Sequence, residues 1–566
     1  MMYYLNMASI ISKKVSGQTY YYLREMARID GKPKMVSERY LGKASDIEAA
    51  MAGAQVMPER TRHLGFGDLA AAWSMLPRLG VAEIIDDVVG SRRSDAGASV
   101  GTYIALATAN RVVAPCSKLA FAEWWKTTAG DRLVKLPAGA MDHRRFWDAM
   151  NELTPEMLDH IEARITARVV ELFDLECSGL VLDMTNFATY IDSANDRAPI
   201  AQRGHAKQKR NDLRLVGLGL VVTRDGGIPL VHHAYAGNRP DVTQFADVIR
   251  TLAERFSSIA EISELTVVYD AGQDSAANQL VIEATGMHFV GSLRPSDHPD
   301  LLKIARSRYR VVDEAAFPGL TAFETKTVAL GATRRVVVTH SEELHTAQAR
   351  GFEQTLGKAR RQLIELQRVA AGGRGRRSRQ ALEQEIIVAT RARWVSRCLS
   401  AFVVDEEDGG MTMKIVEDAA ARRRLENEIF GKRILFSDHE EWSLPEIVAA
   451  YRSQWHVEAD FRQMKDPDVV SFSPMFHWTD QKIRVHAFYC TLALTVARLM
   501  VREAKVAGLD VSVRELLRML GGIEETVLIY PTANGRPRAR RQLTEMDATQ
   551  GKLFELFNLE AYAPKP

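Results

Sequence analysis

Three acidic residues of this 566-residue chain occupy positions from which carboxylates bind metal ions in many sheet proteins. Asp183 directly follows the apolar run LVL, and Asp270 directly follows LTVVY. A carboxylate in that place emerges at the rim of a buried sheet, where ligands and metals bind. Taken alone, either aspartate is more simply an ordinary residue that caps a turn or a helix. The third residue, Glu458, lies within YRSQWHVEADFRQMKD, whose apolar spacing predicts a helix.

The helix around Glu458 is predicted to present an apolar stripe to the sheet and a polar stripe beside it. At about 100° per residue, the polar stripe carries two aromatic residues and two cations around the carboxylate. A solvated helix with a Glu458–Arg462 ion pair is the simpler alternative. That alternative does not explain why aromatic side chains lie on the polar stripe, which consists of Tyr451, Gln454, Trp455, Glu458, Arg462 and Lys465.

Three carboxylates from separate elements can bind two Mg²⁺ ions, for which Mn²⁺ is the expected substitute. A two-metal site activates the attacking oxygen and stabilises the leaving oxygen of a phosphodiester. Cations near such a site contact phosphates, and an exposed aromatic ring stacks on an unpaired base. The residues predicted to contact DNA are Tyr451, Arg452, Gln454, Trp455, Arg462 and Lys465, together with Lys207 and Arg210 of a basic segment.

The elements that position Asp183 and Asp270 are predicted to form a mixed sheet. From residue 179, three strands (LVLDM, LRLVGLGLVV and IPLVHHAYAG) precede a helix, the strand LTVVYD, a second helix and the strand HFVGSL. This order predicts an α/β protein with a five-stranded sheet over residues 176–294. The pattern is compatible with a ribonuclease H-like core, although other mixed sheets fit it as well.

The rest of the chain divides by its residue pattern into five further regions. Residues 1–64 are β-rich, with two strands around a turn at 30–33, and residues 65–175 have helical spacing. Residues 295–430 interrupt the sheet with strand-like pieces and a charged helix. Residues 431–525 return to it through the strand KRILF and a helix that a Ser443–Glu446 capping box begins and that runs to about Lys465. Residues 526–566 form a C-terminal tail.

Composition excludes several classes of protein. Hydrophobic residues make up 46% of the chain, which is ordinary for a globular protein, and the net charge is only +2. Basic residues nevertheless cluster in segments 202–214, 372–379 and 535–541, each of which is either a phosphate contact or a solvated surface. Four distant cysteines and the lack of a signal-peptide pattern predict a cytoplasmic protein. We expect no membrane partner, because the apolar stretch 485–500 is short, and no nucleotide cofactor, because no GxxxxGK[ST] sequence occurs.

Several of these segments together resemble the DDE transposases of bacterial insertion sequences. The helix is similar to the Tyr–Arg–Glu–Lys signature of one branch, in which an inserted β-rich domain precedes the catalytic glutamate. Tyr451, Glu458 and Lys465 match the signature, and Gln454 stands in place of its arginine. DMTNFATYIDS and VVYDAGQDSAANQ resemble the motifs of the first and second aspartates.

The resemblance implies that Asp183, Asp270 and Glu458 are the catalytic, metal-binding residues. It implies a ribonuclease H-like core interrupted by an insertion domain over 295–430. Residues 1–64 and residues 65–175 are both candidates for the region that reads DNA. Members of the family bind the terminal inverted repeats of their element, cut DNA with Mg²⁺ and join the freed 3′-hydroxyl to target DNA. Because two ends are cut together, the expected DNA complex contains a homodimer, with 65–175 as a candidate dimerisation region.

Two other functions remain open at the level of sequence. One is a catalytically silent repressor of the same fold that binds the transposon ends. Three carboxylates brought together argue against it, because they repel one another unless a metal ion neutralises them. The other is a metal-dependent nuclease that cuts DNA without strand transfer. Asp192 is the first substitute for Asp183 if that assignment fails.

Overall fold

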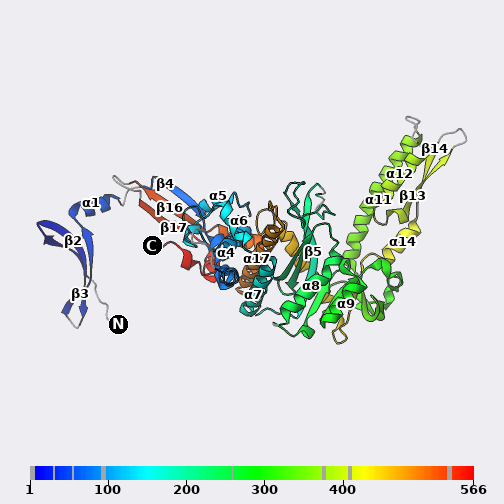
Figure 1. The fold of residues 1–566 in the computed structure, drawn as a ribbon, viewed down its shortest axis with the longest axis horizontal. Coiled ribbons are helices and arrows are strands. Elements are labelled where there is room, and N and C mark those ends of the chain that lie inside the picture. The colour runs from blue at the N-terminus through cyan, green and yellow to red at the C-terminus, as the bar shows by residue number, and fades with distance from the viewer. Residues whose placement is uncertain are drawn as a thin grey trace.

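The computed structural model is elongated, with a small β-sheet unit at one end and a projecting helical arm at the other (Figure 1). Between them lie a helical region and a large mixed sheet. The structure describes residues 7–29, 32–53, 57–90, 97–207, 210, 212–257, 259–371, 378–405, 411–531 and 538–565.

The large sheet contains nine strands rather than the predicted five. The five predicted strands are neighbours in it, and β5, β6 and β7 form an antiparallel meander. Strands β8 and β9 run parallel to β5 on its other side. The order across the sheet is β10 (Arg310–Val311), β11 (Leu320–Ala329), β12 (Ala332–Ser341), β15 (Lys432–Ser437), β9 (His288–Leu293), β8 (Thr266–Tyr269), β5 (Gly179–Thr189), β6 (Arg214–Thr223) and β7 (Pro229–Ala236).

The four extra strands come from β15 and from the segment that was expected to stand apart. Strand β12 pairs with β15, which in turn pairs with β9, so that both continue the sheet. The side chains of Val336, Val337 and Val338 are fully buried, as expected for an interior strand covered on both faces. This burial explains why the sheet extends beyond β9 instead of ending there.

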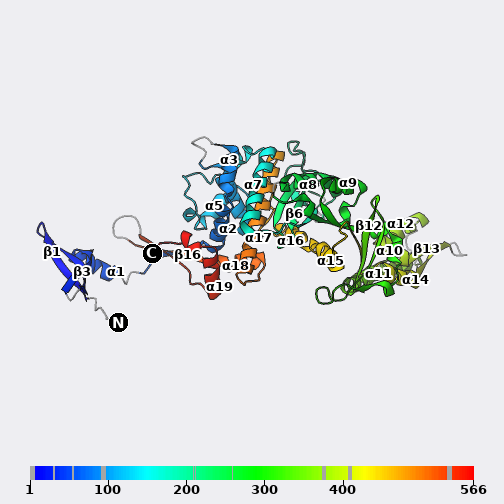
Figure 2. The same cartoon turned by 90° about the horizontal axis from the view of Figure 1, so that it is seen from below.

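Helices cover both faces of the sheet. In Figure 2, α8 (Asp241–Phe256) and α9 (Ala276–Thr285) lie on one side, and α15 (Leu444–Arg452) and α16 (Gln454–Met464) lie on the other. Helix α16 packs against β5 and β6, while α15 packs against β8 and β9. The signature helix is therefore held against the strands that carry the two aspartates.

The predicted single helix from Ser443 to Lys465 is two helices that meet at Ser453. The capping box is confirmed, because the Glu446 backbone N–H donates to the Ser443 hydroxyl and the Glu446 carboxylate accepts from the Ser443 N–H. The break arises where the buried Ser453 hydroxyl donates to the Ala450 carbonyl at 2.5 Å. A serine side chain that competes for a backbone carbonyl disturbs a helix in this way.

The projecting arm has a hydrophobic core of its own. Its long helix α11 (Glu342–Ala371) leaves directly from β12, and the arm returns to the sheet just before β15. The two ends of the arm are joined by a hydrogen bond from the Ser341 N–H to the Gly431 carbonyl at 2.9 Å. The other arm elements are α12 (Arg379–Thr390), α13 (Val395–Cys398), β13 (Leu399–Asp405), β14 (Met411–Glu417) and α14 (Ala419–Glu428).

The helical region is joined to the C-terminal part of the chain. Helix α17 (Asp480–Val506) packs against α2, α4, α7 and β7 and so connects this region to the sheet. By length and composition α17 is apolar enough to cross a membrane, but 89% of its most apolar window is buried inside the protein. The region also contains α2 (Gly67–Arg78), α3 (Val81–Val89), α4 (Val100–Val113), α5 (Phe121–Lys126), α6 (His143–Asn151), α7 (Pro155–Phe173), α18 (Val513–Gly521) and α19 (Ala548–Leu556).

Two small antiparallel sheets complete the fold. One joins β4 (Arg60–Gly65) to β16 (Glu524–Tyr530) and β17 (Arg538–Leu543), so that the tail packs against residues near the N-terminus. The other contains β1 (Met7–Val15), β2 (Gln18–Ile29) and β3 (Lys32–Gly42), followed by α1 (Ala44–Gly53). Of the predicted turn at 30–33, residues 30 and 31 lie outside the described residues. No described hydrophobic side chain before Phe66 is buried.

A buried carboxylate attaches the helical region to the sheet. Glu162 of α7 accepts a hydrogen bond from the Arg255 guanidinium of α8 at 2.6 Å. It also accepts from the His232 backbone N–H of β7 at 3.1 Å and contacts the ring of that histidine. Although burial alone raises it, the pKa of Glu162 falls to about 2 because of the Arg255 and His232 charges.

Candidate active site

Asp183 is half-buried and lies inside the interior strand β5, which continues to Thr189, instead of at the strand end as predicted. One carboxylate oxygen, Oδ1, accepts a hydrogen bond from the Met184 N–H at 2.7 Å. Burial raises the pKa of Asp183 to about 6; the Met184 N–H and the Lys207 ammonium oppose this, and the negative charge of Asp270 adds to it. The two predicted aspartates are therefore near enough to interact electrostatically.

Asp270 directly follows β8 and is exposed. Its Oδ1 accepts hydrogen bonds from the Ala271 N–H at 2.7 Å and from the Tyr451 hydroxyl at 3.2 Å. Both bonds to Asp270 end on its Oδ1, and the bond to Asp183 likewise ends on the Oδ1 of that residue. Within the described part of the chain, the second oxygen of each aspartate has no hydrogen-bond partner, so each presents one oxygen to a ligand.

Two lysines lie beside Asp183. The Lys465 ammonium, at the end of α16, donates to the Thr185 hydroxyl at 2.8 Å. The Lys207 ammonium donates to the Met184 carbonyl at 2.5 Å and to the Asp241 carboxylate at 2.9 Å. Burial and the Lys207 charge lower the pKa of Lys465. These predicted DNA-contact residues thus lie at the carboxylates.

Arg210, the other basic residue predicted to contact DNA in this segment, lies apart from that group. Its guanidinium forms an exposed pair with the carboxylate of Asp212, at 2.8 and 2.9 Å. Nothing described in the structure brings its side chain to either aspartate. Its exposed position on the loop before β6 remains compatible with a phosphate contact.

Glu458 is exposed on α16 and lines a groove of about 360 Å³. The groove runs between α15, α16, the strands β12 and β15, and the first turns of the arm helix α11. Its lining includes Tyr451, Arg452, Gln454 and Trp455, which come from the signature segment. Among the described residues, Glu458 and the two aspartates do not form a group whose carboxylate oxygens all lie within 4.8 Å of one another.

The polar stripe of the signature segment differs from its predicted form. Trp455 is 58% exposed and Arg462 is also exposed, as predicted. Tyr451 and Gln454 are instead buried, and the Tyr451 hydroxyl faces Arg433 and Asp270. The Gln454 amide nitrogen is buried without a hydrogen-bond partner. Arg452 is exposed and its guanidinium lies over the Phe317 ring at 4.9 Å.

Two residues at the site were missed by sequence reasoning. Asp241 begins α8 and accepts hydrogen bonds from Lys207 and from the Tyr235 hydroxyl at 2.6 Å. In the sequence it looks like an ordinary helix-start residue. Arg433 of β15 donates to the Tyr451 hydroxyl at 3.1 Å. An arginine at the start of a strand gives no local signal of such a role.

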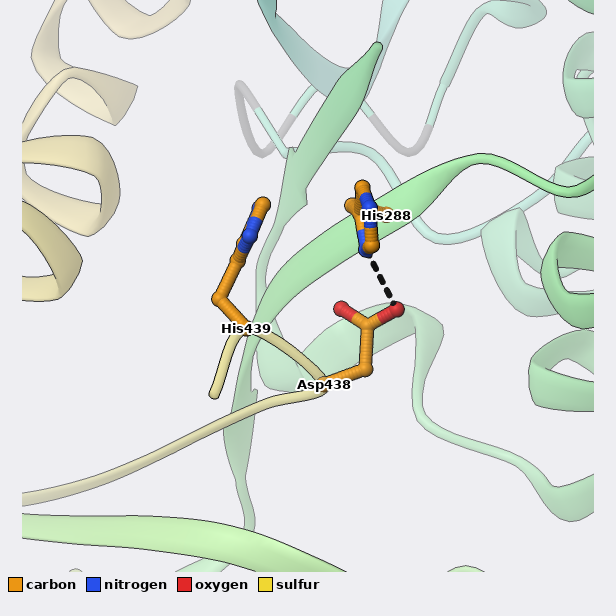
Figure 3. A group of neighbouring side chains, drawn as sticks. All are labelled: His288, Asp438 and His439. Carbon is orange, nitrogen blue, oxygen red and sulfur yellow. Dashed lines mark hydrogen bonds and ion pairs between the residues drawn. The ribbon is translucent and has the colours of Figure 1, made fainter. Parts of the chain in front are cut away.

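A separate group of two histidines and one aspartate lies at the start of β9 and just after β15, at the edge of the sheet opposite to Asp270. Figure 3 shows His288 at the start of β9 beside Asp438 and His439, which follow β15. His288 Nδ1 lies 2.9 Å from an Asp438 oxygen, and the two imidazole rings lie 4.3 Å apart at 30°. His439 also stacks on Trp442 at 3.6 Å. Two nitrogens and one carboxylate do not match Mg²⁺, which prefers oxygen ligands.

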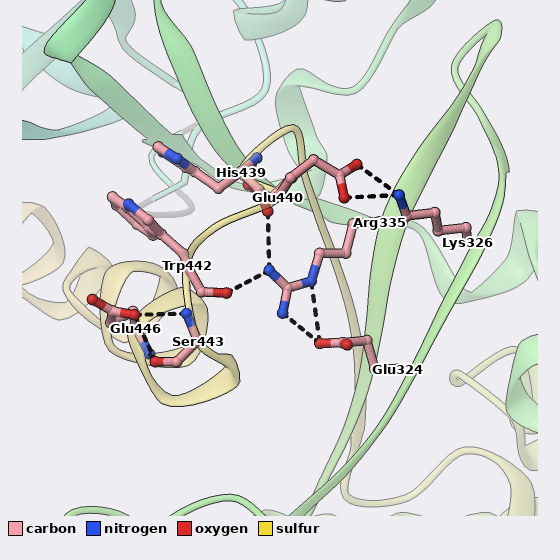
Figure 4. A network of polar contacts seen from close by, with 9 residues as sticks. Glu324, Lys326, Arg335, His439, Glu440, Trp442, Ser443 and Glu446 are labelled. Atoms are coloured by element: carbon pink, nitrogen blue, oxygen red, sulfur yellow. Dashed lines mark hydrogen bonds and ion pairs between the residues drawn. The ribbon is translucent and has the colours of Figure 1, made fainter.

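The loop that precedes α15 is tied to the sheet by Arg335 of β12 (Figure 4). Its guanidinium donates to the Glu324 carboxylate at 2.7 Å and to the carbonyls of His439 at 3.0 Å and Trp442 at 2.5 Å. The side chain of Arg335 is only 10% exposed. These bonds fix the position at which α15 begins, and therefore the position of Tyr451 on that helix.

We expect the substitution Arg335→Met to lower the free energy of unfolding by about 2–3 kcal/mol, because it leaves Glu324 and two loop carbonyls without their charged donor. Urea denaturation at pH 7 measures this effect. Lys326→Met is the matched control, since Lys326 forms only an exposed pair with Glu440, and such pairs contribute less than about 1 kcal/mol. Equal losses in the two variants would contradict the anchoring role of Arg335.

Comparison with known proteins identifies the class to which this fold and site belong. Residues 178–496, more than half of the chain, match the family described as the transposase DDE domain, and the protein therefore belongs to that family. The predicted class is thus confirmed. A cryo-EM structure of the piggyBac transposase synaptic complex with hairpin DNA is similar with a TM-score of 0.37 and 9% identity over 82% of each chain. No curated protein matched the chain.

Proposed function

We propose that the protein is the transposase of a bacterial insertion sequence and acts in the cytoplasm. It binds the terminal inverted repeats as a homodimer, cleaves the DNA at the ends of the element and joins the 3′-hydroxyl ends to target DNA. Asp183, Asp270 and Glu458 are the catalytic residues. The observation that carries the proposal is the arrangement of Asp183 and Asp270 on adjacent parallel strands, each with one oxygen unused by the protein.

The strand order supports a ribonuclease H-like core. The sequence β7, β6, β5, β8, β9 joins an antiparallel meander to two parallel strands. Asp183 lies within β5, the central strand of these five, and Asp270 directly follows its parallel neighbour β8, at the strand end where ligands of such sheets bind. We further propose that residues 1–64 and 65–175 contact DNA and that 65–175 contributes to the dimer.

The donor set fits divalent metal ions. Free carboxylate oxygens are the ligands that Mg²⁺ and Mn²⁺ prefer. Two ions held by Asp183, Asp270 and Glu458 would supply activation of the attacking oxygen and stabilisation of the leaving oxygen. Glu458 is exposed on its groove and is therefore accessible to a ligand.

The other residues of the site orient the carboxylates and the DNA. Tyr451 donates to Asp270 and fixes the rotation of its carboxylate. The positive charge of Lys207 favours the ionised form of Asp183. The exposed side chains of Arg452 and Arg462 contact phosphates, and Trp455 offers an open aromatic face for a base.

The test is incubation of the purified protein with a plasmid that carries the DNA flanking its own gene. We expect Mg²⁺-dependent cuts at discrete flanking positions, followed by joined products, and neither with Glu458→Gln. Cleavage without joined products would favour a metal-dependent nuclease. Binding of the flanks without any cleavage by the wild type would favour an end-binding repressor.

A further inference from the structure

Arg433 and Tyr451 stand between two hollows at the edge of the candidate site. The groove of about 360 Å³ contains Glu458, and a second hollow of about 310 Å³ contains Asp270. Both hollows share Arg433, Tyr451 and Leu344 in their lining. A change in Arg433 or Tyr451 therefore reaches the surroundings of two carboxylates that come from different elements.

The hydrogen bonds give the direction of the contact. A guanidinium has donors only, so the bond of 3.1 Å between Arg433 Nη1 and Tyr451 must end on the tyrosine oxygen. The hydroxyl proton of Tyr451 is then directed to Asp270 Oδ1, at 3.2 Å. Arg433 also lies over the face of the Tyr451 ring, with its guanidinium carbon 5.7 Å from the centroid.

We infer that Arg433 is a positioning residue of this site, which orients the Asp270 carboxylate through Tyr451. The inference rests on the proposed function and deepens it. By holding the phenol as a donor, Arg433 keeps Tyr451 as the second donor to Asp270 Oδ1 beside the Ala271 N–H, and the other Asp270 oxygen would then be available to a metal ion. Its charge also lies in the groove of Glu458, where Gln454 contributes only a neutral, buried amide.

Within the described part of the chain, no other cationic side chain donates a hydrogen bond to the Tyr451 hydroxyl. Arg452 lies over Phe317, and Lys465 donates to Thr185 on the Asp183 side. The buried Tyr451 has no second cationic donor among the described residues. The neutral Ser292 hydroxyl also interacts with the Tyr451 oxygen. Loss of Arg433 therefore removes the charged donor that directs the Tyr451 proton to Asp270, whereas loss of Arg452 does not.

The experiment is a double-mutant cycle of Arg433→Gln and Tyr451→Phe, with Arg433→Lys as the conservative variant. Misplacement of a catalytic group by about 1 Å can cost as much as 100-fold in rate. We expect either single substitution to slow cleavage between about 10- and 100-fold. Because the two residues act in series, the double variant is expected to be within about twofold of the slower single variant. Arg433→Lys, which keeps a donor, recovers part of the lost rate.

Binding of Mn²⁺ to the DNA-free protein, followed by electron paramagnetic resonance, gives a second readout that does not depend on cleavage. Arg433→Gln, Tyr451→Phe and the double variant should each weaken Mn²⁺ binding about 10- to 100-fold, and equally. Arg250→Gln, an exposed cation of α8 paired with Asp247, is the control and should leave both readouts unchanged. Circular dichroism verifies that each variant is folded.

The outcomes separate the inference from the function on which it rests. If the wild type binds Mn²⁺ and cleaves DNA, but the two single effects multiply in the double variant, Arg433 acts independently of Tyr451 and the inference is overturned. Wild-type rates and Mn²⁺ affinity in Arg433→Gln would overturn it as well. If the wild type neither binds Mn²⁺ nor cleaves, the proposed function itself fails, and no metal site remains for Arg433 to position.

Discussion

Replacement of Asp270 by alanine is expected to reduce DNA cleavage about a thousandfold or more, while binding of the transposon ends changes less than about twofold. Several kcal/mol of transition-state stabilisation depend on metal ions that this carboxylate helps to hold, and each 1.36 kcal/mol is about tenfold in rate. Asp183→Ala and Glu458→Gln should behave alike. Cleavage is measured on labelled end DNA in Mg²⁺, and binding by gel shift in Ca²⁺.

Asp192→Ala is the matched control for this series. Asp192 lies close to Asp183 in sequence, but its carboxylate accepts the Ala194 N–H at 2.8 Å in an exposed turn. We expect normal cleavage from this variant. Full activity of Asp183→Ala together with an inactive Asp192→Ala would transfer the catalytic role to Asp192. Loss of end binding in all three catalytic variants would instead mean that the residues shape the DNA-binding surface.

Replacement of Glu162 by glutamine is expected to lower the free energy of unfolding at pH 7 by about 3 kcal/mol. The substitution leaves the buried Arg255 guanidinium without its counter-charge. The folded-state pKa of Glu162 is about 2, below the ordinary value of 4.5, so folding favours the ionised form. Stability from this carboxylate is therefore complete above pH 4.5 and is lost as the pH falls toward 2.

Urea denaturation at a series of pH values tests both parts of this prediction. The difference between the wild type and Glu162→Gln should be largest near pH 7 and should shrink as the pH falls below about 4. Glu171→Gln, on the same helix, is the control, because Glu171 forms an exposed pair with Arg168 at 3.5 Å. A pH-independent difference for Glu162→Gln would show that neutral hydrogen bonding and packing of this side chain, and not its charge, supply the stability.

Local patterns predict those parts of the fold whose cause is local. The apolar runs before Asp183 and Asp270 identified β5 and β8, and the Ser443–Glu446 spacing identified the start of α15. The break at Ser453 was not predictable in this way. A serine in a helical pattern gives no sign of whether its hydroxyl meets water or a backbone carbonyl in a buried setting.

Features that depend on pairing between distant segments could not be read from the sequence. Strands β10 to β12 look like parts of an independent insertion until β12 is seen to pair with β15. The pairing of β15 with β9, against which α15 packs, places Arg433 beside Tyr451, and no periodicity within KRILF contains this information. The burial of Tyr451 and Gln454 has the same origin, because it depends on where the sheet edge and the arm meet α15.

The hydrogen bond between Ser341 and Gly431 has an evolutionary consequence. It makes the 89 residues from 342 to 430 a cassette whose two attachment points are already closed by the sheet. Lengthening or shortening a segment with fixed ends costs little, because the entropy of loop closure grows only with the logarithm of length. Descendants of this chain can therefore exchange or resize the cassette while the strands that carry the carboxylates keep their register.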